Sequence, residues 1–200
     1  MADDRSPALL IVDVQYDFCP GGALAVPGGD EVIEPLRRAA ARFAALGLPV
    51  YASRDWHAPE STHFADRGGT WPVHCVQGTS GARIREELAL PSSTLIVTKG
   101  HGDDDGYSAF SGEVSGRGRL GDDLRARGVT HLYVGGLATD YCVRHSVLDA
   151  LREGFEVTVL GDAVRAVDVT AGDGERALEE MRGAGAEIAP SERVPLDPSR

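Results

Sequence analysis

Short apolar runs alternate with amphipathic stretches along the chain. Runs of strand length occur at residues 8–14, 48–53, 93–98, 131–135, 155–160 and 186–189. Apolar residues at helical spacing mark residues 30–46, 83–88, 120–127, 143–152 and 170–182. The first run is apolar almost throughout, which is typical of a strand buried on both faces of a parallel sheet. This alternation predicts a three-layer α/β/α fold, with an open, mostly parallel sheet of about six strands and helices on both faces.

The segments between these elements define loops and the extent of the domain. Residues 57–81 and 100–118 show little periodicity, so we expect long loops there, the first of them functional. At 200 residues with 42% apolar content, the chain is long enough to bury one real core. We therefore expect a single domain over residues 1–200, with its core at about 8–189 and a tail at 190–200.

The charge balance narrows the choice of partners. A net charge of −11 argues against a nucleic acid or an anionic membrane and favours a small ligand. No apolar run reaches the roughly 18 residues that cross a bilayer. The acidic N-terminus lacks a secretion signal, so we expect a cytoplasmic protein. The three cysteines, Cys19, Cys75 and Cys142, form no disulfide pattern.

Chemically competent residues fall at the ends of different predicted strands. Asp13 ends the first run, Asp55 and His57 follow the second, Lys99 follows the third, and Cys142 comes after the fourth. In parallel sheets the ligand lies beyond the carboxyl ends of the strands. We therefore expect these side chains to meet at one edge of the sheet.

Cys142 has the setting of a nucleophile. It follows a glycine turn at 135–136 and opens an amphipathic segment, so we expect it in the first turn of a helix capped by Thr139 or Asp140. The positive end of that helix favours a thiolate over a thiol.

The other groups complete two kinds of site. Asp13 can take the thiol proton and Lys99, the only lysine of the chain, can hold the resulting charge. Small residues from Gly135 onwards can aim backbone N–H groups at an oxyanion. Asp55, His57 and His74, with His63 as a further ligand, are donors typical of zinc, iron or manganese.

Several longer motifs occur in a characteristic order. They are residues 12–24 (VDVQYDFCPGGAL), 53–57 (SRDWH), 70–79 (TWPVHCVQGT), 99–100 (KG), 107–110 (YSAF) and 136–143 (GLATDYCV). Over residues 8–189 the chain resembles the nicotinamidase/pyrazinamidase group of the isochorismatase-like cysteine hydrolases.

That resemblance implies roles for individual residues. The implied catalytic triad is Asp13, Lys99 and Cys142. The implied metal, zinc first and otherwise iron or manganese, is held by Asp55, His57 and His74, with His63 as an extra ligand. A cis peptide between Leu137 and Ala138 would direct the N–H groups of Ala138 and Cys142 at the oxyanion. The implied substrate contacts are Phe18, Trp71, Tyr107 and Leu137.

The implied reaction is deamidation of nicotinamide, and of pyrazinamide, through a cysteine thioester in NAD salvage; a homo-oligomer is compatible with it. Two alternatives stay open: a related carbon–nitrogen hydrolase acting on maleamate, N-carbamoyl or ureido substrates, and a non-catalytic metal-binding protein. Two features depart from the group, Tyr16 and the acidic run Asp103–Asp105, and either can alter the pocket.

Overall fold

The computed structural model describes residues 6–102 and 106–194, and within them the chain forms one eight-stranded sheet. The strand order is β5-β4-β3-β2-β1-β6-β7-β8. Six strands run parallel and confirm the predicted sheet. They are β1 (Pro7–Val12), β2 (Val50–Asp55), β3 (Leu95–Lys99), β6 (His131–Leu137), β7 (Glu156–Arg165) and β8 (Glu187–Ala189).

The two remaining strands lie where a loop was predicted. β4 (Glu113–Val114) and β5 (Gly118–Arg119) form a short antiparallel extension beside β3. Two-residue strands carry no periodic pattern, which is why residues 100–118 read as a loop. The predicted end of β7 at residue 160 is also wrong, because the strand passes Gly161 through a register shift and continues to Arg165.

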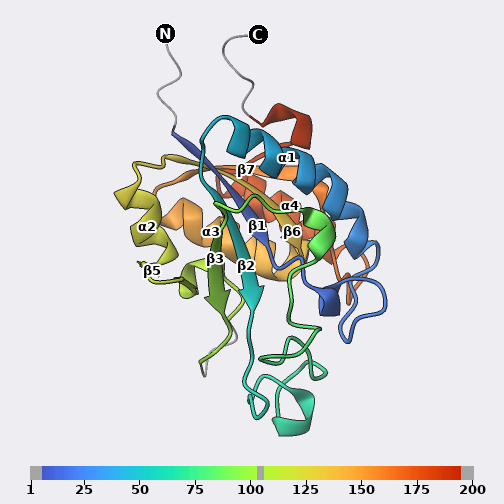
Figure 1. Ribbon diagram of the computed structural model, residues 1–200. Helices are drawn as coiled ribbons and strands as arrows, with labels where there is room; N and C mark the ends of the chain where they lie inside the picture. The colour runs from blue at the N-terminus through green and yellow to red at the C-terminus, as the bar shows by residue number, and fades with distance from the viewer. Residues whose placement is uncertain (1–5, 103–105, 195–200) are drawn as a thin grey trace.

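Helices cover both faces of the sheet, as predicted (Figure 1). α1 (Ile33–Ala45) packs Leu36 and Phe43 into the core on one face. The other face is covered by three helices, α2 (Leu120–Ala126), α3 (Arg144–Arg152) and α4 (Asp173–Gly183). The helix predicted at 83–88 is wrong, since only a single 3-10 turn, Glu86–Leu88, forms there.

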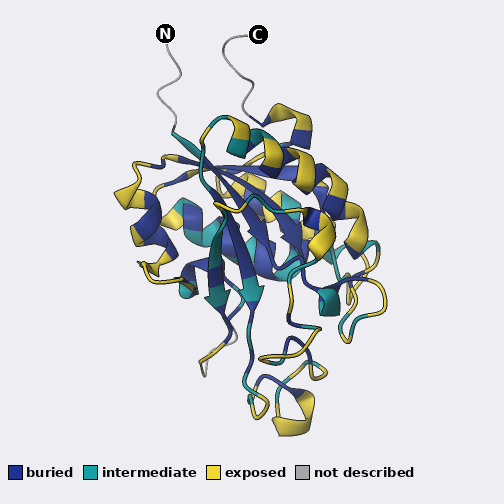
Figure 2. Cartoon of the chain, viewed as in Figure 1, coloured by how far each residue is buried: buried dark blue, intermediate teal, exposed yellow. Residues whose placement is uncertain are grey.

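The sheet is the most deeply buried part of the molecule (Figure 2). Every residue of β6 is buried, and Leu9, Leu10 and Val12 of β1 have no exposed surface. Each fully buried Leu, Ile, Val or Phe contributes about 1.5–3 kcal/mol, so this double-sided core stabilises the strands whose ends hold the site. Among the described residues, no helix is both long and apolar enough to cross a membrane.

Beyond the carboxyl end of β2 the chain leaves the sheet as a long excursion over residues 56–81 (Figure 1). Backbone hydrogen bonds tie both ends of the excursion to the core, from Trp56 N to Lys99 O of β3 at 2.9 Å and from Asp17 N to Gly81 O at 3.0 Å. This excursion therefore stands over the same sheet edge at which β1, β3 and β6 end.

Candidate active site

The ends of four neighbouring strands bring the predicted groups together. Asp55 is the last residue of β2 and Lys99 the last of β3, and the two are register partners. Asp13 directly follows β1, and Cys142 lies in the turn after β6. All four residues are buried. The convergence expected from the sequence is therefore present, at the edge where parallel sheets bind ligands.

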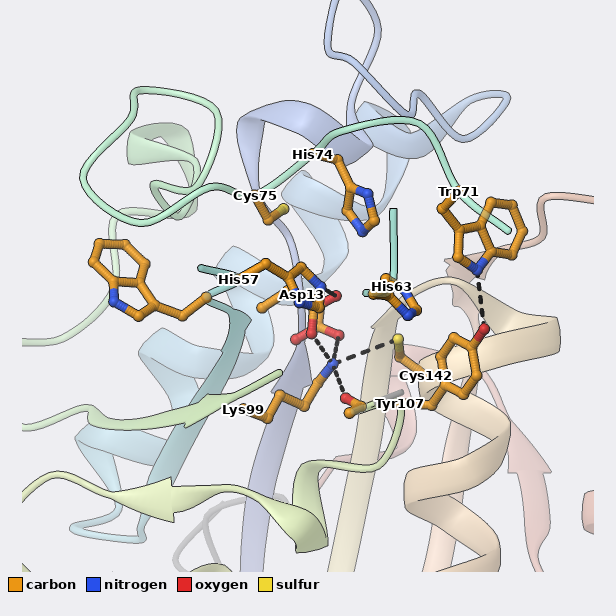
Figure 3. A network of polar contacts seen from close by, with 12 residues as sticks. Asp13, His57, His63, Trp71, His74, Cys75, Lys99, Tyr107 and Cys142 are labelled. Atoms are coloured by element: carbon orange, nitrogen blue, oxygen red, sulfur yellow. Dashed lines mark hydrogen bonds and ion pairs between the residues drawn. The ribbon is translucent and has the colours of Figure 1, made fainter. Parts of the chain in front are cut away.

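Lys99 stands at the centre of this cluster (Figure 3). Its Nζ lies 2.8 Å from Asp13 Oδ2, 2.5 Å from Asp55 Oδ1 and 3.5 Å from Cys142 Sγ. It also donates to the carbonyl oxygen of Gly106 at 2.8 Å. One oxygen of each carboxylate and the sulfur lie within 4.8 Å of one another. A compact ammonium with three donors fits this position, whereas the planar fork of arginine does not.

Burial governs the protonation of the thiol. It raises the pKa of Cys142; Lys99 opposes this rise, and the carboxylates of Asp13 and Asp55 add to it. Burial also raises the pKa of Asp13, against the nearby ammonium. Burial and the two carboxylates therefore oppose the thiolate that the start of a helix would favour. The structure favours a thiol whose sulfur lies within 4.8 Å of a carboxylate oxygen of Asp13, the group that can accept its proton.

For Asp55 and Lys99, by contrast, the neighbouring charges outweigh burial and favour the charged forms. Burial opposes ionisation of Asp55, but the Lys99 ammonium outweighs it and holds the pKa of that carboxyl well below its usual range. Burial also opposes the charge on Lys99, yet Asp13 and Asp55 outweigh it and raise the pKa of the amine. A charged Lys99 paired with an ionised Asp55 is therefore the stable state.

The turn that carries Cys142 differs in detail from the predicted helix start. A cis peptide joins Leu137 to Ala138, as expected. A π-helical turn, Thr139–Val143, follows it, and α3 begins only at Arg144. Cys142 therefore precedes the α-helix rather than occupying its first turn, in a local geometry that is frequent at functional sites.

Neither predicted cap forms. No side chain caps the π-helical turn or α3. The carboxylate of Asp140 instead accepts hydrogen bonds from the backbone N–H groups of Val167 and Asp168, at 3.0 and 2.9 Å. Asp140 thus fastens the turn to the segment after β7, a contact between distant segments that local capping rules do not predict.

Three histidines form a second cluster beside the first. Ring nitrogens of His57, His63 and His74 lie within 4.8 Å of one another, and all three residues are buried. Asp55 borders this cluster through Oδ2, which lies 3.7 Å from His57 Nε2. The four predicted ligands are therefore neighbours, with the histidines as the compact group.

The chemistry of this cluster fits a divalent metal. Both ring nitrogens of His57 are buried and have no hydrogen-bond partner in the part of the chain that the structure describes. His74 Nδ1 lies 2.7 Å from the carbonyl oxygen of Pro72, which can only accept, so its Nε2 keeps a free lone pair. Burial lowers the pKa of His74 to about 4, which keeps the imidazole neutral. Neutral, oriented imidazoles are what a metal requires.

A cavity of about 390 Å³, counted to its open mouth, lies against both clusters. The predicted contacts Phe18, Trp71 and Tyr107 line it, together with Cys142. Trp71 Nε1 donates to the Tyr107 hydroxyl at 2.9 Å, which joins two separate loops across this wall (Figure 3).

Two side chains that we expected to contact or shape the pocket do not line it. The side chain of Leu137 is fully buried in the core and does not line the cavity. Tyr16 also lies outside the lining, where its ring packs under the guanidinium groups of Arg83 and Arg85. We therefore keep neither side chain in the proposed pocket. The acidic run Asp103–Asp105 lies outside the described residues.

Three residues near the site were missed from the sequence. Tyr141 lines the cavity and packs edge-on against Trp71, with ring centroids 4.9 Å apart. Gln15 holds the backbone of Asp55 with both ends of its amide, at 2.7 and 2.9 Å. Ser53 donates to Asp13 Oδ1 at 2.7 Å. Ser53 could have been found from the sequence. It lies two residues before Asp55 in β2, so the two side chains point to the same side of the strand.

The fold and the site place the chain among α/β enzymes that act at the carboxyl edge of a parallel sheet. Residues 7–193 match the Isochorismatase domain, and the chain belongs to this family.

Within this family, the chain is similar to nicotinamidases and pyrazinamidases. The nicotinamidase of Escherichia coli is 40% identical over 200 residues, covering 90% of this chain and 93% of that protein. The nicotinamidase/pyrazinamidase of Mycobacterium tuberculosis is 40% identical over 187 residues, covering 90% and 97%. The structure of the pyrazinamidase of Pyrococcus horikoshii in complex with zinc is similar at a TM-score of 0.85 and 43% identity, covering 92% of this chain and 99% of that one.

Proposed function

We propose that the protein hydrolyses nicotinamide to nicotinate and ammonia, and pyrazinamide likewise, through a thioester on Cys142. The observation that carries this proposal is the position of the Cys142 sulfur, 3.5 Å from Lys99 Nζ and on the wall of a cavity that His63 and His74 also line. A nucleophile with its base and cation thus faces the same small space as a candidate metal site. The product would serve NAD salvage.

In the first half of the proposed reaction, Asp13 acts as general base and then as general acid. Its carboxylate takes the Cys142 proton while the sulfur bonds to the carboxamide carbon and the carbonyl electron pair moves onto oxygen. When the tetrahedral intermediate collapses, the carbon–nitrogen bond breaks and Asp13 returns the proton to the leaving nitrogen. Ammonia departs and a thioester remains.

The second half uses the same groups on water. Asp13 takes a proton from water, whose oxygen attacks the thioester carbon. The carbon–sulfur bond then breaks, and Asp13 returns the proton to the Cys142 sulfur. In both halves we assign the oxyanion to the backbone N–H groups of Ala138 and Cys142. Throughout, the Lys99 ammonium offsets the charge that moves between Asp13 and the sulfur.

The aromatic wall and the histidines hold the ring in this proposal. Phe18 and Trp71 would enclose the pyridine, and Tyr107 would keep Trp71 in place through their hydrogen bond. Asp55, His57, His63 and His74 would hold a divalent metal, for which we propose zinc. When bound, that metal supplies a Lewis acid for the ring nitrogen, directly or through water.

The cavity also separates this substrate from the superfamily alternatives. Maleamate and most N-carbamoyl substrates carry a carboxylate, which needs a cationic partner. The described lining contains no arginine or lysine, and its only formally charged member is Asp55. Lys99 lies below, already paired with Asp13 and Asp55. A neutral aromatic amide suits this lining, and the buried ion-pair cluster argues against a role limited to metal binding.

The test is an ammonia-release panel with nicotinamide, pyrazinamide, maleamate and an N-carbamoyl amino acid, each with and without a chelator. We expect kcat/KM for the two aromatic amides to exceed that for the anionic amides at least 100-fold, and to fall on chelation. Faster turnover of an anionic amide would replace this proposal with the alternative.

A further inference from the structure

Asp13 is held in an uncommon backbone conformation just beyond β1. Its φ is 49°, in the left-handed region that few residues other than glycine adopt. A side chain that must aim one particular oxygen from such a position needs support from its neighbours, since a shift of about 1 Å can cost 100-fold in rate.

Ser53 of β2 supplies that support through a reciprocal pair of hydrogen bonds. Its hydroxyl donates to Asp13 Oδ1 at 2.7 Å and accepts from the Asp13 backbone N–H at 3.3 Å. Ser53 is 1% exposed and Asp13 is fully buried, so bulk solvent does not compete with either contact. The serine thereby fixes both the backbone and the carboxylate of one residue.

This pairing leaves the two carboxylate oxygens with different roles. Oδ1 accepts a hydrogen bond from the Ser53 hydroxyl. Oδ2 accepts no hydrogen bond of regular geometry among the described residues and lies 2.8 Å from Lys99 Nζ. The Cys142 sulfur lies within 4.8 Å of an oxygen of the same carboxylate, and the Lys99 ammonium lies 3.5 Å from that sulfur. The oxygen that remains open is therefore the one on the side of the ammonium.

We propose that Ser53 is a positioning residue for the reaction: it selects Oδ2 of Asp13 as the atom that takes the Cys142 proton. The proposal deepens the function given above and rests on Asp13 being the base. It assigns no contact between Ser53 and substrate, so its effect belongs in the chemical step rather than in binding.

The experiment compares Ser53→Ala and Ser53→Thr with wild type. Thr keeps a hydroxyl that can restore both bonds, and Ala removes them. We expect Ser53→Ala to lower kcat for nicotinamide about 10- to 100-fold with KM within about twofold, in line with the cost of misplacing a catalytic group. We expect Ser53→Thr to recover kcat to within about fivefold of wild type, as far as the hydroxyl can be placed again.

A second readout does not depend on the substrate. Alkylation of the buried Cys142 thiol by iodoacetamide also requires a proton acceptor, so its rate, followed on the peptide that contains Cys142, should fall about 10-fold in Ser53→Ala and recover in Ser53→Thr. If wild type releases no ammonia from nicotinamide, the proposed function fails while this comparison still decides the role of Ser53.

The control is Thr158→Val, which removes another buried hydroxyl. Thr158 lies in β7, and its hydroxyl is 2.9 Å from Nε2 of His131, the first residue of β6, at the opposite end of that strand from the site. This variant should leave kcat and alkylation unchanged. If Ser53→Ala does not fold, Ser53→Cys, which keeps the volume with a weaker donor, takes its place with the same expected losses. A folded Ser53 variant without the hydroxyl that retains kcat and alkylation within twofold, or that raises KM alone, overturns the proposal.

Discussion

One oxygen of Asp55 lies 2.5 Å from Lys99 Nζ, and the other faces the histidine cluster at 3.7 Å from His57 Nε2. Register pairing of Asp55 with Lys99 at the ends of β2 and β3 produces this arrangement. Asp55 therefore belongs to both clusters, and a substitution there disturbs the nucleophile and the metal ligands together. Tests that separate the two must use other residues.

Lys99→Met tests the buried ion-pair cluster. The substitution keeps the volume but leaves the carboxylates of Asp13 and Asp55 without a counter-charge, so we expect a loss of about 3–5 kcal/mol in the free energy of unfolding, together with loss of activity. Urea unfolding measures it. Arg125→Met is the control, because Arg125 pairs with Glu153 at the surface and should cost less than about 1 kcal/mol. Equal losses in the two variants would show that the cluster is not stabilised by its cation.

Gly100→Ala tests the metal site without replacing any of the proposed ligands. A Cβ at Gly100 would lie 2.7 Å from His57 Cε1, so the imidazole must move. We expect zinc affinity to fall about 10- to 100-fold, as for other disturbances next to metal ligands. Competition with a chromogenic chelator measures the affinity.

Gly47→Ala is the matched control for this substitution. Gly47 has φ +68°, close to the +70° of Gly100, but a Cβ there meets nothing within 4 Å. The two variants share the backbone cost and differ in the clash with His57. Zinc affinity reduced equally in both would remove the histidines from the account of metal binding.

Trp71→Phe tests the contact that joins the two loops over the cavity. It removes the donor of the 2.9 Å hydrogen bond to the Tyr107 hydroxyl, worth about 0.5–1.5 kcal/mol. We expect KM for nicotinamide to rise about 3- to 10-fold, with a smaller change in kcat. Steady-state kinetics measure both.

Tyr107→Phe removes the same hydrogen bond from the acceptor side and should raise KM by a similar factor. If the bond is the cause, the double variant raises KM little more than either single variant does. Fully additive effects would mean that Trp71 and Tyr107 act on the substrate separately.

The sequence predicted those features that follow from strand ends. Asp13, Lys99 and Cys142 are distant in the chain, yet the alternation of strands and helices placed them on one edge, and the structure brings them into contact. The orientation of His63 could not be predicted, because a loop has no periodicity to orient it. In the structure its ring packs parallel to that of His57, with ring centroids 4.8 Å apart.

Features that depend on contacts between distant segments escaped prediction. The partner of Asp140 lies after β7, so local capping rules gave the wrong role. Ser53 and Gln15 are ordinary polar residues until β1 and β2 pair and bury them. The raised pKa of Cys142 has the same origin, because burial and the carboxylates of Asp13 and Asp55 outweigh the lowering effect of Lys99.

The most direct measurement is mass spectrometry of the enzyme quenched in acid during turnover of nicotinamide. We expect a nicotinoyl group on the peptide that contains Cys142, released by hydroxylamine, and no modification or ammonia release in Cys142→Ala. Ammonia release by Cys142→Ala near the wild-type rate, with no acyl group on the wild-type peptide, would contradict a thioester at Cys142.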